Sequence, residues 1–130
     1  MTAPLTLYGI TSCDTVKKAR TWLNERHISY RFHDFKKEGV PPDHLQRWLD
    51  AVGWEKVLNR QGTTWRKLGP DEQAKVCDAA SAAALLVANS SAIKRPVVEW
   101  GDAPDAITVG FKADEWERRL STFAPSSPAP

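Results

Sequence analysis

The fold of this chain can be worked out from one segment near its N-terminus, Thr11-Ser12-Cys13-Asp14-Thr15-Val16-Lys17-Lys18-Ala19-Arg20. The residues before it, 5–10, form an apolar run that is typical of a β-strand. After Cys13, apolar residues recur at the spacing of one helix face, at Val16, Ala19, Trp22 and Leu23. Cys13 is therefore predicted to lie at a strand-to-helix turn, a place that is exposed and often carries function.

This predicted position favours a reactive thiol at Cys13. A thiol just ahead of a helix faces unpaired backbone N–H groups and the positive end of the helix dipole. Lys17 and Lys18 add positive charge nearby. Such surroundings can lower the pKa of a cysteine from about 8.5 to between roughly 3.5 and 7.5. The alternative is a buried structural cysteine, because free cysteine is among the most buried residue types.

Length and composition limit the classes to which this protein can belong. The 130 residues suffice for one domain with a real core, and 42% hydrophobic with 26% charged residues is an ordinary soluble mixture. A net charge of +2 is too small to indicate a nucleic-acid or membrane partner. No apolar run approaches the roughly 20 residues of a membrane span. The first residues lack signal-peptide features, so we expect a cytoplasmic location with both cysteines reduced.

A second strand and a helical middle follow the first helix. Ile28, Tyr30 and Phe32 alternate with polar residues, which predicts a half-buried strand and completes a βαβ unit with a right-handed crossover. Residues 36–42 are expected to form a loop, and 41–91 an all-helical insertion. Within the insertion, residues 61–64 predict a turn, followed by a loop that Trp65 docks against the core.

The C-terminal third predicts a hairpin and a last helix. Apolar, β-branched runs at 93–100 and 107–109 are separated by a turn at 101–105. The last helix is expected to begin at Asp114, and residues 121–130 to form a disordered Pro/Ser tail. A single domain, 1–120, then has the order βαβ, helical insertion, ββα around a mixed sheet. This is the order of the thioredoxin-like α/β fold.

Several short motifs extend this expectation along the chain from about residue 5 to 120. They are Leu7-Tyr8-Gly9-Ile10, Cys13-Asp14-Thr15-Val16-Lys17-Lys18-Ala19, Tyr30-Arg31-Phe32-His33-Asp34-Phe35, Gly62-Thr63-Thr64-Trp65-Arg66-Lys67-Leu68, Asp78-Ala79-Ala80-Ser81-Ala82-Ala83, Ile93-Lys94-Arg95-Pro96 and Gly110-Phe111. Together they resemble the arsenate-reductase-related (ArsC/Spx-like) family of thioredoxin-fold proteins, most closely its small YffB-type branch. The resemblance implies a thiol-dependent reductase with Cys13 as nucleophile, Arg95 facing the site and Pro96 in cis. From the residues alone, a strand start in trans is favoured for Pro96.

The expected chemistry uses a single thiol. A dithiol oxidoreductase would carry a second cysteine three positions after Cys13, but Val16 stands there. Cys77 lies in the helical block and is expected to be a packing residue. An outside thiol must therefore clear the adduct that Cys13 forms with its substrate. The resemblance implies glutathione as this thiol co-substrate, with glutaredoxin as a further candidate partner and no bound cofactor.

The expected binding residues around Cys13 are Ser12, Lys17, Arg60, Arg95 and Pro96. Backbone N–H groups and Lys17 would hold the thiolate and anionic substrate oxygens. Arg95 would clamp an oxyanion or a glutathione carboxylate, because a guanidinium pairs bidentately with such groups. Arg60 is a second candidate for this role or, equally, a solvated surface arginine. No metal site is expected, because no metal-ligand spacing links the cysteines to His27, His33 or His44, and His33 is expected at the surface of its strand.

The substrate expected from these residues is a disulfide. The resemblance implies three arginines around arsenate, of which Arg95 matches one, while in an ungapped comparison the others fall near Lys56 and at Phe111. Each charge-assisted contact is worth about 1.5–3 kcal/mol, so their loss disfavours arsenate relative to a disulfide or a glutathione mixed disulfide.

Two non-enzymatic classes stay open. The Spx-like branch of the family contains regulators that contact RNA polymerase and sense oxidation through paired cysteines, a pair that Val16 removes here. The second class is a thioredoxin-fold scaffold in which Cys13 has lost its catalytic role.

Overall fold

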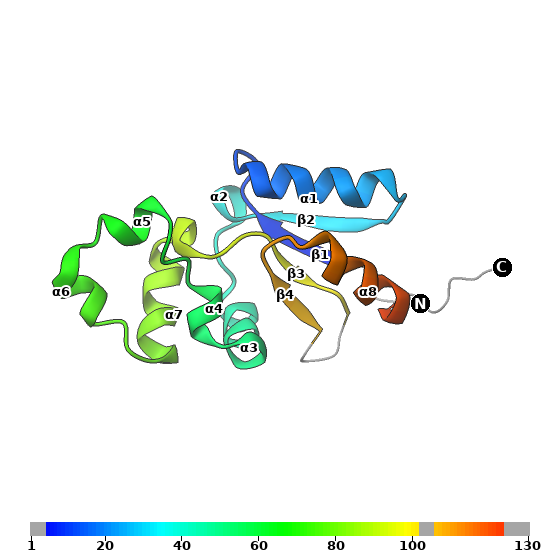
Figure 1. The fold of residues 1–130 in the computed structure, drawn as a ribbon. Coiled ribbons are helices and arrows are strands. Elements are labelled where there is room, and N and C mark those ends of the chain that lie inside the picture. The colour runs from blue at the N-terminus through cyan, green and yellow to red at the C-terminus, as the bar shows by residue number, and fades with distance from the viewer. Residues whose placement is uncertain (1–4, 102–105, 124–130) are drawn as a thin grey trace.

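The elements follow one another in the order that the sequence predicts. The computed structural model describes residues 5–101 and 106–123, with the side chains of 120–123 left out (Figure 1). The elements are β1 (Leu5–Gly9), α1 (Asp14–Glu25), β2 (Tyr30–Asp34), α2 (Phe35–Glu38), α3 (Pro42–Val52), α4 (Trp54–Val57), α5 (Thr63–Arg66), α6 (Gly69–Ala74), α7 (Ala79–Ala88), the 3-10 helix η1 (Ser90–Ala92), β3 (Val97–Glu99), β4 (Ile107–Val109) and α8 (Ala113–Phe123).

The four strands form one mixed sheet in the order β2-β1-β3-β4. β1 runs parallel to β2 and antiparallel to β3, and β4 pairs with β3 in antiparallel fashion. Because side chains alternate along a strand, β1 contributes to both faces of the sheet. Leu7 packs on one face and Tyr8 on the other. Figure 1 shows α1 and α8 beside the sheet, whereas α5 and α6 of the insertion lie farthest from it.

One face of the sheet is covered by α1 and α8. The side chains that α1 buries here are those with helical spacing in the sequence, Val16, Ala19, Trp22 and Leu23. From α8, Trp116 is fully buried and meets Trp22 and Trp100 edge-on, with ring centroids 5.5 and 5.2 Å apart. Edge-to-face packing of large aromatic rings is favourable beyond the area it buries, so these tryptophans fix α8 against α1.

The other face is covered by α3, α4 and α7, which belong to the insertion. Leu45, Trp48 and Leu49 of α3 are buried against Tyr8 and Val97 in a second apolar cluster. Leu58 forms an isolated antiparallel bridge with Ile93, which ties the chain after α4 to the segment that enters β3. The helical insertion therefore shares the core of the sheet. None of the helices in residues 5–101 and 106–123 is long and apolar enough to cross a membrane.

Several element boundaries differ from the expectation. Residues 36–42 are not all loop, because Asp34 accepts a hydrogen bond from the backbone N–H of Lys36 (2.9 Å) and caps α2. Thr63 and Thr64 begin α5 instead of forming a turn. The strand expected at 93–100 is reduced to β3, because Ile93 pairs with Leu58 and Pro96 has no N–H to donate.

The ends of the C-terminal elements also differ. The last helix begins at Ala113, one residue before the expected Asp114. It continues to Phe123, so residues 121–123, expected in the tail, are helical. The expected turn at 102–105 and the rest of the tail, 124–130, lie outside the described residues.

Candidate functional site

Cys13 occupies the N-cap of α1, as the sequence predicts. Its backbone is extended (φ −81°, ψ 125°), and its N–H donates to the Ile10 carbonyl at 3.1 Å. Its own carbonyl accepts the first hydrogen bond of the helix, from the Lys17 N–H at 3.0 Å. The side chain is half-buried and faces the backbone N–H groups of Thr15 and Val16. The thiol is thus held at the open end of α1.

Val16 fills the position where a dithiol enzyme would carry its second cysteine. Its side chain is fully buried beneath the first turn of α1 and packs against β1 at Gly9. A Cβ atom built on Gly9 would lie 2.7 Å from Cγ2 of Val16, closer than real contacts of this kind. Gly9 therefore lets the first turn of α1 lie directly on β1, and it fixes the position of Cys13 relative to the sheet.

The surroundings of Cys13 favour its thiolate. Burial raises the pKa of the thiol, but three groups outweigh it and lower the pKa below its ordinary value. They are the backbone N–H of Val16, the guanidinium of Arg95 and the backbone N–H of Thr15. Lys17, expected to share this role, is exposed and is not among these main contributors. The helix N–H groups expected at this turn are present, and the cation that assists them is Arg95.

Arg95 reaches Cys13 from the segment that precedes β3. Its Nη1 donates to the Ser91 carbonyl at 2.9 Å, which holds the guanidinium in place, and a hydrogen bond to Cys13 acts on the thiol. Its Nε is buried and has no hydrogen-bond partner among the described residues. The Arg95–Pro96 peptide bond is cis, as the resemblance implies, and the Gly110 N–H donates to the Pro96 carbonyl at 2.8 Å. A buried donor beside a thiolate can serve an anionic substrate atom.

The other expected site residues lie in two places. Ser12 is exposed at the turn that carries Cys13. Arg60 lies 3.7 Å from Glu55, with its guanidinium 5.3 Å from the ring centroid of Trp54. It lines a cavity of about 670 Å³ that neither Cys13 nor Arg95 lines. The structure therefore brings Arg95 to the thiol and places Arg60 in a different cavity.

Cys77 is exposed, so the expectation that it packs in the core is wrong. It precedes the capping box of α7, in which Asp78 accepts from the Ser81 N–H at 2.9 Å, and its own N–H donates to the Ser81 hydroxyl at 3.0 Å. The hydrogen bonds of this cap hold Cys77 at the surface.

His33 is also placed differently from the expectation. Its side chain is only 14% exposed and its ring lies 4.9 Å from that of Tyr8. The described residues contain no group of three or more His, Cys, Asp or Glu side chains arranged to hold a metal ion.

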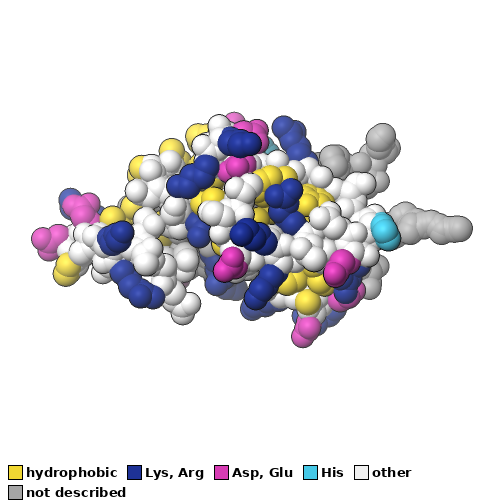
Figure 2. Space-filling view, turned by 90° about the horizontal axis from the view of Figure 1, so that it is seen from above, with side chains coloured by type: hydrophobic (Ala, Val, Ile, Leu, Met, Phe, Trp, Pro, Cys, Tyr) yellow, Lys and Arg dark blue, Asp and Glu magenta, His cyan; other side chains and the backbone are white. Residues whose placement is uncertain are grey.

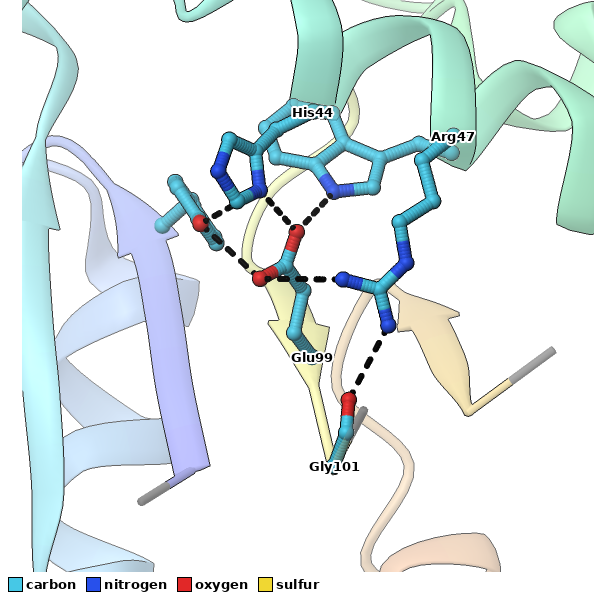
Figure 3. Close-up of polar contacts among 6 residues, drawn as sticks. His44, Arg47, Glu99 and Gly101 are labelled. Atoms are coloured by element: carbon cyan, nitrogen blue, oxygen red, sulfur yellow. Dashed lines mark hydrogen bonds and ion pairs between the residues drawn. The ribbon is translucent and has the colours of Figure 1, made fainter. Parts of the chain in front are cut away.

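A buried carboxylate forms a second polar cluster, on the α3 side of the sheet (Figure 3). Glu99 accepts hydrogen bonds from the Tyr8 hydroxyl (3.0 Å) and the Trp48 indole N–H (2.8 Å). It also lies 2.7 Å from Nδ1 of His44 and 3.7 Å from the guanidinium of Arg47. Burial and the charge of Glu99 raise the pKa of Tyr8. These contacts compensate a buried charge, so we interpret the cluster as structural.

No local sequence pattern predicts this cluster, because its members lie far apart in the chain. One signal was available, since Glu99 interrupts the apolar run Val97-Val98-Glu99-Trp100. A charged residue inside a buried strand needs partners, but the sequence does not say where they come from.

The surface on the α1 side of the molecule carries positive charge. Figure 2 views the molecule from this side and shows Lys and Arg side chains spread over it, with fewer Asp and Glu side chains among them. An anionic molecule that approaches this face meets a favourable field before it contacts the protein.

Comparison with known proteins places the chain in a family. The model of the ArsC family matches residues 8–119. A solved YffB protein superposes with a TM-score of 0.83 at 49% identity, covering 89% of this chain and 98% of that one. An arsenate reductase (ArsC) related protein from Brucella melitensis gives a TM-score of 0.68 at 48% identity, with coverage of 89% and 93%. The global transcriptional regulator Spx of Listeria innocua is 26% identical over 118 residues, 89% of this chain and 86% of Spx. The thioredoxin-like fold is thereby confirmed, and the chain belongs to the ArsC family.

Proposed function

We propose that this protein is a monothiol reductase that uses glutathione to reduce mixed disulfides through Cys13. The observation that carries the proposal is the position of Cys13, at the N-terminus of α1 with its pKa lowered by two helix N–H groups and Arg95. A thiolate is the nucleophile in thiol–disulfide exchange. Val16 leaves no neighbouring thiol in the first turn of α1 to complete the reaction.

The proposed reaction has two exchange steps. The Cys13 thiolate attacks the glutathione sulfur of a mixed disulfide, forms a Cys13–glutathione disulfide and releases the substrate as a thiolate, which takes a proton from water. A second glutathione thiolate then attacks the glutathione sulfur of this adduct, releasing oxidised glutathione and restoring the Cys13 thiolate. Overall, one free glutathione is consumed: its sulfur is oxidised and joins the glutathione already present in the mixed disulfide, while the substrate sulfur is reduced to a thiol. The reaction needs a compartment that supplies glutathione, which supports a cytoplasmic location.

Arg95 has a binding role in this proposal. Its guanidinium is anchored by Ser91 and retains a buried Nε donor without a partner among the described residues. This donor suits a glutathione carboxylate or a developing sulfur anion. Arsenate is a less favoured substrate, because Arg60, the second guanidinium expected beside it, lines another cavity. Ser12 and Lys17, exposed at the rim of the turn, are proposed to contact the bound glutathione.

The test is turnover of a small glutathione mixed disulfide, coupled to glutathione reductase so that oxidised glutathione is read continuously. We expect the Cys77→Ser variant to match the wild type and the Cys13→Ser variant to be inactive. A parallel assay supplies reduced glutaredoxin instead of glutathione and measures the released substrate thiol, which identifies the second thiol. Equal turnover by the wild type and Cys13→Ser would rule the proposal out.

A regulatory function in the manner of Spx is the second candidate, favoured by the likeness to that relative. It predicts no turnover in the coupled assay and binding to RNA polymerase. The buried Val16 side chain speaks against the oxidation sensor, because no second thiol is present in the first turn of α1.

A further inference from the structure

A groove runs along the outer edge of β4. Its volume is about 670 Å³, within the range of roughly 300–1,000 Å³ that is usual for ligand sites. Residues 107–109 of β4 line it, together with the end of α3, the chain around α4 and the first turns of α8. In Figure 1, α4 and α8 lie on opposite sides of β4. The groove thus follows a strand that has a helix on either side.

The walls of the groove are cationic. Five basic side chains line it, against two carboxylates, Glu55 and Glu115; the basic ones are Lys56, Arg60, Lys94, Lys112 and Arg119. Glu55 is exposed and lies 3.7 Å from Arg60, so it neutralises little beyond that arginine. Basic residues come from both walls, and an occupant of the groove is therefore expected to be anionic along its length.

The floor of the groove offers backbone hydrogen bonds. β4 is at the edge of the sheet in the described part of the chain. In the pairing of β3 with β4, Thr108 is opposite Val98. The Trp100 N–H donates to the Ala106 carbonyl, and the Gly110 N–H donates to the Pro96 carbonyl. The backbone N–H and C=O groups of the even-numbered residues of this strand therefore point toward β3. Since consecutive residues of a strand direct their backbone groups to opposite sides, those of Ile107 and Val109 face the groove. Such an edge accepts another strand.

The groove meets the Cys13 site at two adjacent residues. Lys94 lines the groove, and Arg95, next to it in the chain, acts on the Cys13 thiol. Consecutive Cα atoms are about 3.8 Å apart, so the groove and the Cys13 site are neighbours along the backbone of residues 94 and 95.

We propose that this groove binds an acidic, extended segment of the disulfide-bearing protein, which pairs with β4 as an added strand. The inference rests on the proposed function in naming that segment as part of the substrate. Backbone groups on the floor and cations on both walls together fit an acidic peptide better than a compact anion, which would leave the edge of β4 unpaired. The C-terminal segment of this chain does not suit the groove, because residues 120–130 contain no Asp or Glu.

The experiment measures peptide binding without any disulfide chemistry. A labelled peptide of about six residues, a usual strand length, alternates glutamate with valine and contains no cysteine. Fluorescence anisotropy compares it with a glutamine version and with a version that is N-methylated at alternate backbone nitrogens. We expect each change to weaken binding at least tenfold. The double variant Lys56→Gln/Lys112→Gln should weaken binding equally, whereas Lys67→Gln, an exposed lysine outside the groove, should not.

Turnover then separates this inference from the proposed function. The same peptides are given a glutathionylated cysteine at one end, and kcat/KM is compared with that of a small mixed disulfide. We expect the acidic peptide to be preferred at least tenfold, and the double variant to lose this preference while it keeps its turnover of the small disulfide. Acidic binding without any turnover would remove the proposed function and the substrate assignment, but it would leave the peptide site standing. Equal binding of the glutamate and glutamine peptides, undiminished binding of the N-methylated peptide, or salt-sensitive dimerisation through the groove would overturn the inference.

Discussion

The reactivity of Cys13 depends on residues that do not themselves react. The N–H groups of Thr15 and Val16 are fixed by the first turn of α1, and Arg95 is fixed by the Ser91 carbonyl. These donors favour the charged form of the thiol and outweigh its partial burial. The exposed lysines of α1 are secondary, because solvent screens their charge.

Removing Arg95 should raise the pKa of Cys13. The guanidinium stabilises the thiolate, so in Arg95→Ala the proton stays on sulfur to a higher pH and the titration moves upward. The ultraviolet absorbance of the thiolate against pH, measured in the Cys77→Ser background, gives the shift. Lys17→Ala is the matched control and should move the titration less than Arg95→Ala. A larger shift in Lys17→Ala than in Arg95→Ala would show that Lys17, and not Arg95, is the main cation that stabilises the thiolate.

Gly9→Ala should destabilise the protein by about 1–3 kcal/mol, the usual cost of an overpacked core. The added methyl group would lie 2.7 Å from Cγ2 of Val16. Chemical denaturation measures this cost in the wild type and in the Val16→Ala background, where the methyl group has room. We expect the cost to fall in that background, which makes the two substitutions non-additive. Additive costs would show that Val16 is not what Gly9 accommodates.

At the scale of elements, the local sequence pattern is sufficient to predict a helix or strand where the segment is long and buries one face. The spacing of Val16, Ala19, Trp22 and Leu23 predicts α1 correctly, and these are the residues that α1 buries. α2 escaped prediction because four residues show no periodicity, and it depends on the cap that Asp34 provides. The sequence predicts a strand longer than β3, because Ile93 is a β-branched residue typical of strands. In the structure Ile93 pairs with Leu58 instead.

Glu99→Ala should cost about 3 kcal/mol of stability, because it removes the acceptor from buried donors. The Trp48 indole N–H would lose its partner, and the Tyr8 hydroxyl would lose one of two. Thermal and chemical unfolding of the variant measure the loss, with Glu25→Ala, an exposed substitution on α1, as control. A change within about 0.5 kcal/mol, as expected for the control, would show that the cluster does not stabilise the sheet.

At the scale of the whole molecule, the site is assembled from segments distant in sequence. Cys13 was predictable, because its turn has a local signature, and Arg95 was implied by the family resemblance. The placement of Arg60 was not predictable, since it depends on how the helical insertion packs against β4 and α8. The same packing creates the basic groove, whose residues come from three separate parts of the chain and share no motif.

The proposed reactivity of Cys13 depends on a thiol held in its charged form at the start of α1. The most direct measurement is the rate of iodoacetamide alkylation of Cys13 against pH, in the Cys77→Ser variant so that one thiol is read. We predict a midpoint clearly below the value of about 8.5 for free cysteine, with fast alkylation retained at neutral pH. A midpoint at or above that value would contradict the account, because Cys13 would then be a protonated thiol under the conditions in which it is proposed to act.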